Sequence, residues 1–135
     1  MERLRILVAD DDQDCASALA LFFYDCGHAV REAYDGKRAL ELAQEFRPHA
    51  IVLDLGMPAV DGHGVARTIR SYAWARDTLI LAFSGHGEFL DRVHSQDAGF
   101  DYHITKPVQF CELVALVERR DDALHRQTRL LRGCG

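Results

Sequence analysis

Several polar side chains in this sequence come directly after apolar runs of strand length, in positions where they could act together. Aspartates follow two such runs: Asp10, Asp11 and Asp12 come after Arg5–Ala9, and Asp54 comes after Ala50–Leu53. Carboxylates held close together repel one another and raise each other's proton affinity, so a stable cluster requires a cation. Hard oxygen ligands select Mg²⁺ or a similar ion. The pattern therefore predicts that three or four carboxylates converge on a metal ion.

Helix capping is the alternative explanation for Asp11 or Asp12. Asp12 stands where the N-cap of the next helix would be, and aspartate is favoured there because its side chain accepts backbone N–H bonds. We therefore interpret Asp12 as a cap. Capping does not explain Asp54, which follows an apolar run and precedes a Gly-Met-Pro turn.

Two further apolar runs end in groups that suit an anionic oxygen. Leu79–Phe83 is followed by Ser84 and Gly85, which offer a hydroxyl and an unhindered backbone N–H. The run that ends at Thr105 is followed by Lys106, whose ammonium would neutralise an anionic group beside a metal site. Each signal is weak alone, because a lone lysine is usually a solvated charge. Their recurrence at the ends of four runs favours a site that binds a cation and an anion together.

The elements that must position these groups alternate between strand-like runs and segments of helical period, which is typical of a parallel sheet with crossover helices. Five strands are predicted: Arg5–Ala9, His28–Ala33, Ala50–Leu53, Leu79–Phe83 and Asp101–Thr105. Apolar stripes mark five helices: one that stops at Gly27, one from Gly36 to before Pro48, one with Val65, Ile69 and Tyr72 or Ala73, one with Phe89, Leu90 and Val93, and one with Phe110, Leu113, Val114 and Val117.

Strand polarity predicts the order of the sheet. The first, third and fourth strands are almost wholly apolar, as interior strands covered on both faces should be. The second and fifth strands carry charged or polar side chains and belong at the edges: Arg31, Glu32, Asp101 and His103. The order 2-1-3-4-5 satisfies this constraint and right-handed crossovers, and it defines a flavodoxin-like doubly wound α/β fold. Asp10 and Asp54 then lie at its switch point, where such sheets bind ligands.

Length and composition predict one soluble domain. The chain has 135 residues, 48% of them hydrophobic and 27% charged, and a net charge of −5. This charge does not suggest a nucleic-acid binder, and the apolar runs are far shorter than the roughly 20 residues of a membrane span. Without a secretory signal at its start, the chain is expected in the cytoplasm.

The C-terminal residues differ from the rest. We expect one domain over residues 1–120 and a basic tail over residues 121–135, because residues 119–135 hold five arginines against two aspartates. Val117, Leu124 and Leu131 recur every seven residues, so the tail could instead extend the last helix. Polar residues at the intervening positions favour a solvated tail over a coiled coil.

Taken together, the motifs resemble the receiver domain of two-component response regulators, the CheY-like family. The resemblance lies in five motifs in this order and spacing: Asp10-Asp11, Asp54, Met57-Pro58, Ser84-Gly85 and Lys106-Pro107. It implies that Asp54 accepts a phosphoryl group from a histidine kinase or a histidine phosphotransfer protein. It also implies a signalling domain that promotes only its own phosphorylation and dephosphorylation.

The resemblance also implies roles for the neighbours of Asp54. Asp11, Asp54 and the backbone carbonyl of Gly56 would ligate Mg²⁺, and Asp10 would assist through water. Ser84, Gly85 and Lys106 would bind the phosphoryl oxygens. Such an arrangement is chemically reasonable, because phosphoryl transfer needs positioning and charge neutralisation more than covalent assistance.

Switching in this family implies that the hydroxyl of Ser84 moves toward the phosphoryl group while an aromatic side chain three residues before the lysine turns inward. His103 occupies that position, where tyrosine or phenylalanine is more usual. An imidazole could make the switch sensitive to pH. The alternative is that His103 is a surface residue of an edge strand.

Two loop residues could tune the lifetime of the phosphorylated state. Gly56 lies two residues after Asp54 and would leave the phosphoryl group open to water, whereas His86 could hydrogen-bond to it or orient water. The alternative is that both residues have no kinetic effect.

The output is expected to pass through a partner protein, because the chain has no room for a DNA-binding domain. The resemblance implies that helix four, strand five and helix five form the partner surface. A free-standing regulator and a receiver from a hybrid kinase both fit the sequence.

A haloacid-dehalogenase-like phosphatase is the competing interpretation. Asp10-x-Asp12 imitates the first motif of that family, with Asp10 as nucleophile. This interpretation leaves Asp54 unexplained and lacks a further acidic pair directly after a later strand.

Overall fold

The computed structural model describes residues 3–55, 62–84, 100–105 and 110–118. Its centre is a parallel sheet of five strands: β1 (Arg5–Ala9), β2 (Ala29–Ala33), β3 (Ala50–Asp54), β4 (Leu79–Ser84) and β5 (Tyr102–Thr105). The strands lie in the order β2-β1-β3-β4-β5, which confirms the predicted order and both predicted edge strands.

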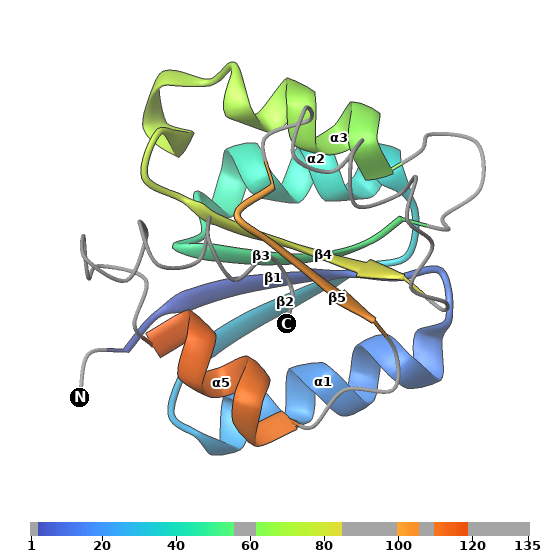
Figure 1. The fold of residues 1–135 in the computed structure, drawn as a ribbon, viewed down its shortest axis with the longest axis vertical. Helices are drawn as coiled ribbons and strands as arrows, with labels where there is room; N and C mark the ends of the chain where they lie inside the picture. Colours follow the sequence, from blue (N-terminus) through green and yellow to red (C-terminus); the bar gives the residue numbers. More distant parts are fainter. Residues whose placement is uncertain (1–2, 56–61, 85–99, 106–109, 119–135) are drawn as a thin grey trace.

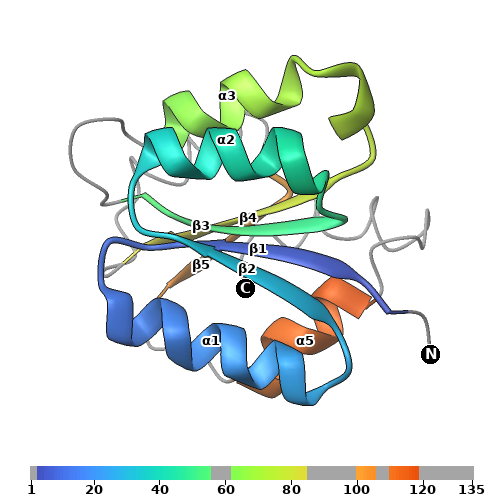
Figure 2. The ribbon, with the colours of Figure 1, turned by 180° about the vertical axis from the view of Figure 1, so that it is seen from behind.

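Helices cover both faces of this sheet. They are α1 (Gln13–Asp25), α2 (Gly36–Phe46), α3 (Gly62–Arg70) and α5 (Phe110–Glu118). α2 and α3 lie on one face, and α1 and α5 lie on the other (Figures 1 and 2). The helix predicted around Phe89, Leu90 and Val93 and the tail 121–135 lie outside the described residues. The arrangement is the predicted doubly wound α/β fold.

Two apolar clusters form the core, one on each face of the sheet. Leu7, Ile51 and Ile80 belong to the cluster under α2 and α3. Their neighbours along the same strands belong to the cluster under α1 and α5, where Phe23 is fully buried. Successive strand residues therefore point to opposite faces, as the strand period requires. β1, β3 and β4 are buried on both faces, and this burial holds their carboxyl ends in fixed positions.

Local signals set the ends of the first two helices as predicted. The Asp12 side chain accepts hydrogen bonds from the backbone N–H groups of Asp14 (3.1 Å) and Cys15 (3.3 Å), which confirms its role as the N-cap of α1. Gly27, at φ 98°, follows the C-cap of α1 in a backbone conformation that side chains disfavour. α2 stops before Pro48, since proline cannot continue a helix.

Five element boundaries differ from the sequence prediction. β3 and β4 each extend one residue further, to Asp54 and Ser84, and β5 begins at Tyr102 rather than Asp101. β2 begins at Ala29 rather than His28, because the His28 N–H bonds to the Phe23 carbonyl at the end of α1. The prediction that Tyr72 or Ala73 belongs to the third helix is wrong. α3 ends at Arg70, and Ala73–Ala75 form a separate 3₁₀ turn. The Arg70 guanidinium donates to the carbonyls of Ala75 (3.1 Å) and Thr78 (2.8 Å) and thereby stabilises this turn.

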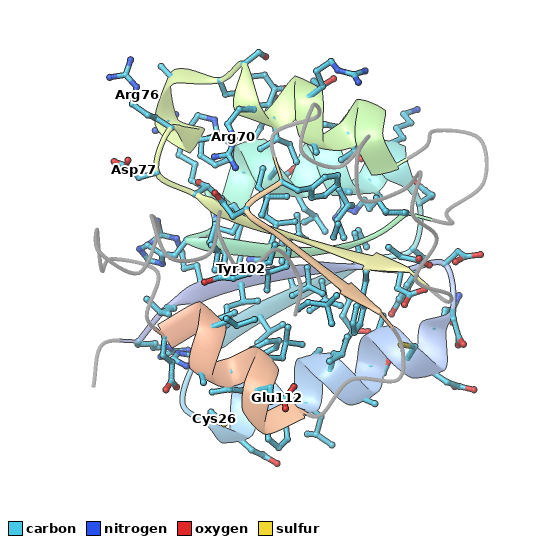
Figure 3. All side chains as sticks on the ribbon, in the orientation of Figure 1. Cys26, Arg70, Arg76, Asp77, Tyr102 and Glu112 are labelled. Atoms are coloured by element: carbon cyan, nitrogen blue, oxygen red, sulfur yellow. The ribbon has the colours of Figure 1, made fainter. Side chains whose placement is uncertain are left out.

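The same guanidinium joins this turn to the start of β5. Arg70 reaches from the end of α3 toward β5, whereas Arg76 points away from the domain (Figure 3). One oxygen of Asp101 accepts hydrogen bonds from Arg70 (3.2 Å) and from the backbone N–H of Ile80 (2.9 Å). Asp101 therefore ties α3, β4 and β5 together.

Replacing Asp101 with alanine is expected to lower the free energy of unfolding by about 2 kcal/mol, because two partly buried donors lose a charged acceptor. Urea denaturation measures the change. Glu41→Ala is the matched control, since Glu41 forms an exposed pair with Arg38 that should contribute less than about 0.5 kcal/mol. Equal losses in the two variants would contradict the structural role of Asp101.

No helix among the described residues is long and apolar enough to cross a membrane.

Candidate functional site

The register of the sheet brings the carboxylates of two strands together. β1 and β3 are parallel neighbours, with Ala9 opposite Leu53, so Asp10 and Asp54 follow paired residues at the same edge. The Asp10 N–H donates to the Ala33 carbonyl at the end of β2 (3.0 Å). Asp54 is the last residue of β3 and lies opposite Phe83 of β4. Backbone bonds to both neighbouring strands thus fix this corner of the sheet.

Asp10, Asp11 and Asp54 form a carboxylate cluster at this edge. One oxygen of each side chain lies within 4.8 Å of the others. Asp10 is 1% exposed and Asp54 is 6% exposed, whereas Asp11 is open to solvent. The convergence of three carboxylates is confirmed, and Asp12 is the member of the acidic run that caps α1 instead. Two buried carboxylates side by side are costly without a positive charge between them.

The turn after β1 orients the cluster. Asp10 accepts the backbone N–H of Asp12 through Oδ1 (3.0 Å), so its carboxylate is held against the start of α1. Asp11, between these two residues, keeps an exposed side chain. The result is an all-oxygen donor set with one solvent-facing member, which fits Mg²⁺ because that ion retains several water ligands in proteins. The cluster could hold a metal ion in this way.

The other predicted site residues are described only in part. β4 and β5 are parallel, and Ser84 pairs with Thr105 at the edge that also carries Asp54, so the ends of these strands meet as predicted. For Ser84 and His103 the structure describes the backbone alone. The remaining predicted residues lie outside the described residues: Gly56, Gly85, His86 and Lys106. Their roles stay predictions.

The sequence predicted site residues after four strands and none after the second. β2 nevertheless holds the site in place through its backbone. It supplies the Ala33 carbonyl that accepts the Asp10 N–H. Beyond its end, Tyr34 donates a hydrogen bond to Glu32 (3.0 Å), and Ser17 of α1 donates to the same oxygen (2.9 Å). No side-chain pattern signals a backbone contact, and the Ser17–Glu32 pair depends on how α1 lies against β2.

Tyr34 should ionise at higher pH than an ordinary tyrosine. Its hydrogen bond to the Glu32 carboxylate raises the pKa of the phenol above the usual 10.0. Any stability from this bond is fully present below the pKa that Tyr34 has in the unfolded chain. It is lost as pH rises through the higher pKa that Tyr34 has in the folded protein. Glu32→Gln should lower the Tyr34 pKa toward the usual value. The measurement is ultraviolet titration of each protein against its Tyr34→Phe counterpart, and an unchanged midpoint in Glu32→Gln would contradict the assignment.

Comparisons with known proteins identify the family of this chain. The response regulator receiver domain family matches residues 6–118. The transcriptional regulatory protein PrrA of Mycobacterium tuberculosis is 40% identical over 84% of this chain and 48% of its own length. The response regulator MprA of Mycobacterium ulcerans is 39% identical over 94% of this chain and 52% of its own length. The chain thus spans about half the length of these curated relatives.

Solved structures show the same family. A putative response regulator from Chloroflexus aurantiacus has a TM-score of 0.82 and 27% identity, and the match covers 88% of this chain and 98% of that one. The Francisella response regulator 1452 receiver domain has a TM-score of 0.78 and 29% identity, covering 87% and 96% of the two chains. The phosphatase interpretation has no support among these relatives. The chain belongs to the family of response regulator receiver domains, which are signalling domains of two-component systems.

Proposed function

We propose that Asp54 is the phosphoacceptor of this receiver and that Mg²⁺ is held beside it by Asp11, Asp54 and the backbone carbonyl of Gly56, with Asp10 acting through water. The observation that carries the proposal is the cluster itself. Three carboxylates lie together at the switch point of the sheet. Asp10 and Asp54 are both buried, and Asp54 is the one that ends a strand.

The proposed reaction is an in-line displacement on a phosphohistidine. A carboxylate oxygen of Asp54 forms a bond to phosphorus while the phosphorus–nitrogen bond to the donor imidazole breaks, and the imidazole leaves with the bond's electron pair. When bound, Mg²⁺ neutralises the charge on the phosphoryl oxygens. Ser84, Gly85 and Lys106 bind the same oxygens. The product is an acyl phosphate, which water later hydrolyses to restore the carboxylate.

The proposed donor is a histidine kinase or a histidine phosphotransfer protein, as for response regulators in general.

The proposed output runs through the helix predicted around residues 89–93, β5 and α5 to a partner protein in the cytoplasm. For the receiver itself we propose no direct contact with nucleic acid. Ser84 and His103 would carry the switch.

Gly56 and His86 are proposed to shorten the lifetime of the phosphoryl group. Replacing both with bulky apolar residues should shield the acyl phosphate from water and slow its hydrolysis severalfold. Phosphoryl loss can be followed by intact mass after the phosphodonor is removed. Hydrolysis at the parental rate would show that neither residue controls the lifetime.

The function is tested by incubating the protein with acetyl phosphate and Mg²⁺, followed by intact mass measurement. One phosphoryl group should be added, should depend on Mg²⁺, and should be removed by hydroxylamine, which cleaves acyl phosphates. The same protein is then given p-nitrophenyl phosphate. Continuous turnover of that ester without a phosphorylated protein would contradict the receiver function and support a phosphatase.

A further inference from the structure

A buried histidine lies far from the carboxylate cluster, where the end of α5 meets the start of β1. His28 is 2% exposed and stands between the end of α1 and the start of β2. Its Nδ1 accepts the backbone N–H of Leu4 (3.1 Å), and its Nε2 lies 3.0 Å from a carboxylate oxygen of Glu118. Glu118 is the last residue of α5, and its side chain is 24% exposed.

The hydrogen-bond partners fix the form of the imidazole. Because Nδ1 accepts a backbone N–H, it carries no hydrogen, and the ring hydrogen must be on Nε2. Nε2 therefore donates to Glu118. The neutral ring satisfies both partners at once, whereas a second hydrogen on Nδ1 would point at the Leu4 N–H.

The His28–Glu118 pair lies where it can hold the end of α5 against the sheet. The C-terminal end of α5 lies beside the start of β1 in both views of the fold (Figures 1 and 2). The buried contacts of α5 are apolar, through Leu113, Val114 and Val117. Apolar contacts are non-directional, whereas a hydrogen bond fixes both distance and direction. The His28–Glu118 bond is thus suited to set the rotation of the last turn of α5.

We propose that His28 and Glu118 form a latch that fixes the last turn of α5 against the β1–β2 edge of the sheet, and with it the point at which the chain continues into residues 119–135. His28 is a positioning residue in this device. The latch does not depend on phosphorylation, so it is tested on the unphosphorylated protein. Its outcome is independent of the role of Asp54.

The test is amide hydrogen exchange, measured by NMR on the full chain. Glu118→Ala and His28→Asn should each speed exchange of the amides in the last turn of α5 about tenfold, as expected for one charge-assisted bond. Asparagine can still accept the Leu4 N–H through its side-chain oxygen, but it cannot reach Glu118. The Leu4 amide should therefore stay protected in both variants. Glu118→Gln keeps an acceptor for Nε2 and should restore most of the protection.

The double variant and a control complete the design. His28→Asn with Glu118→Ala should exchange no faster than either single variant, because both remove the same bond. Glu112→Ala changes an exposed carboxylate at the other end of α5 and should leave the last turn unchanged (Figure 3). Imidazole ¹⁵N shifts should report the Nε2–H form in the wild type and in Glu118→Ala. Slower or unchanged exchange in Glu118→Ala, additive effects in the double variant, or the Nδ1–H form in the wild type would overturn the latch.

Discussion

Asp54→Asn is expected to reduce phosphorylation by acetyl phosphate to background, while Asp12→Asn retains it. An amide oxygen is a poor nucleophile and carries no charge to hold a cation, so the substitution removes both proposed roles of Asp54. Asparagine has nearly the same shape, and the fold should survive at this buried position. Asp12 lies at the same edge but caps α1, and asparagine is an equally good cap. Intact mass after a fixed incubation measures both proteins.

An Asp10→Asn variant separates the two chemistries weighed for this chain. If Asp10 assists the metal through water, its loss should slow phosphorylation but leave Asp54 as the modified residue. If Asp10 were the nucleophile, Asp10→Asn would not be phosphorylated at all, whereas Asp54→Asn would still be phosphorylated. Phosphorylation of Asp54→Asn to the wild-type extent would show that Asp54 is not the acceptor.

The placement of Asp54 could be predicted because it follows from burial. β1, β3 and β4 are almost wholly apolar, and only interior strands of a doubly wound sheet are covered on both faces. Once those strands are central, the residues after Ala9 and Leu53 must share one edge, as the register shows. The carboxylate cluster was therefore predictable from strand polarity before any pairing was known.

The features that were missed depend on contacts between distant segments. α3 ends at Arg70 because the guanidinium binds carbonyls of the following turn and Asp101, a residue thirty-one positions away. Apolar spacing alone would carry the helix on to Tyr72. His28 looked like the first residue of a strand, yet its backbone closes α1 and its ring binds Glu118. Periodicity shows which face of an element is buried, but it does not show which polar group of a distant element will contact that face.

Mg²⁺ should stabilise the wild-type protein, and Asp54→Asn should remove most of that effect. An ion that binds only the folded state at about 100 times its dissociation constant contributes about 2.7 kcal/mol. For a domain of this size, such a gain raises the melting temperature by on the order of 10 °C. Thermal unfolding in chelator and in excess Mg²⁺ measures the difference. Asp14→Asn is the matched control, because Asp14 lies in the first turn of α1 outside the cluster and its variant should respond like the wild type.

The direction in which Asp54→Asn changes the melting temperature without Mg²⁺ is a stricter test. Most substitutions of a buried residue destabilise a protein. Asp54, however, shares a buried corner with Asp10 and lies close to Asp11, so its charge is repelled when no cation is present. Asp54→Asn should therefore melt at a higher temperature than the wild type in chelator, and Asp11→Asn should show a smaller rise because Asp11 is exposed. A lower melting temperature for Asp54→Asn in chelator would mean that other contacts of this carboxylate outweigh the repulsion. In that case repulsion within the cluster would no longer argue for a bound cation, and the Mg²⁺ site would rest on the metal-dependent rise in melting temperature alone.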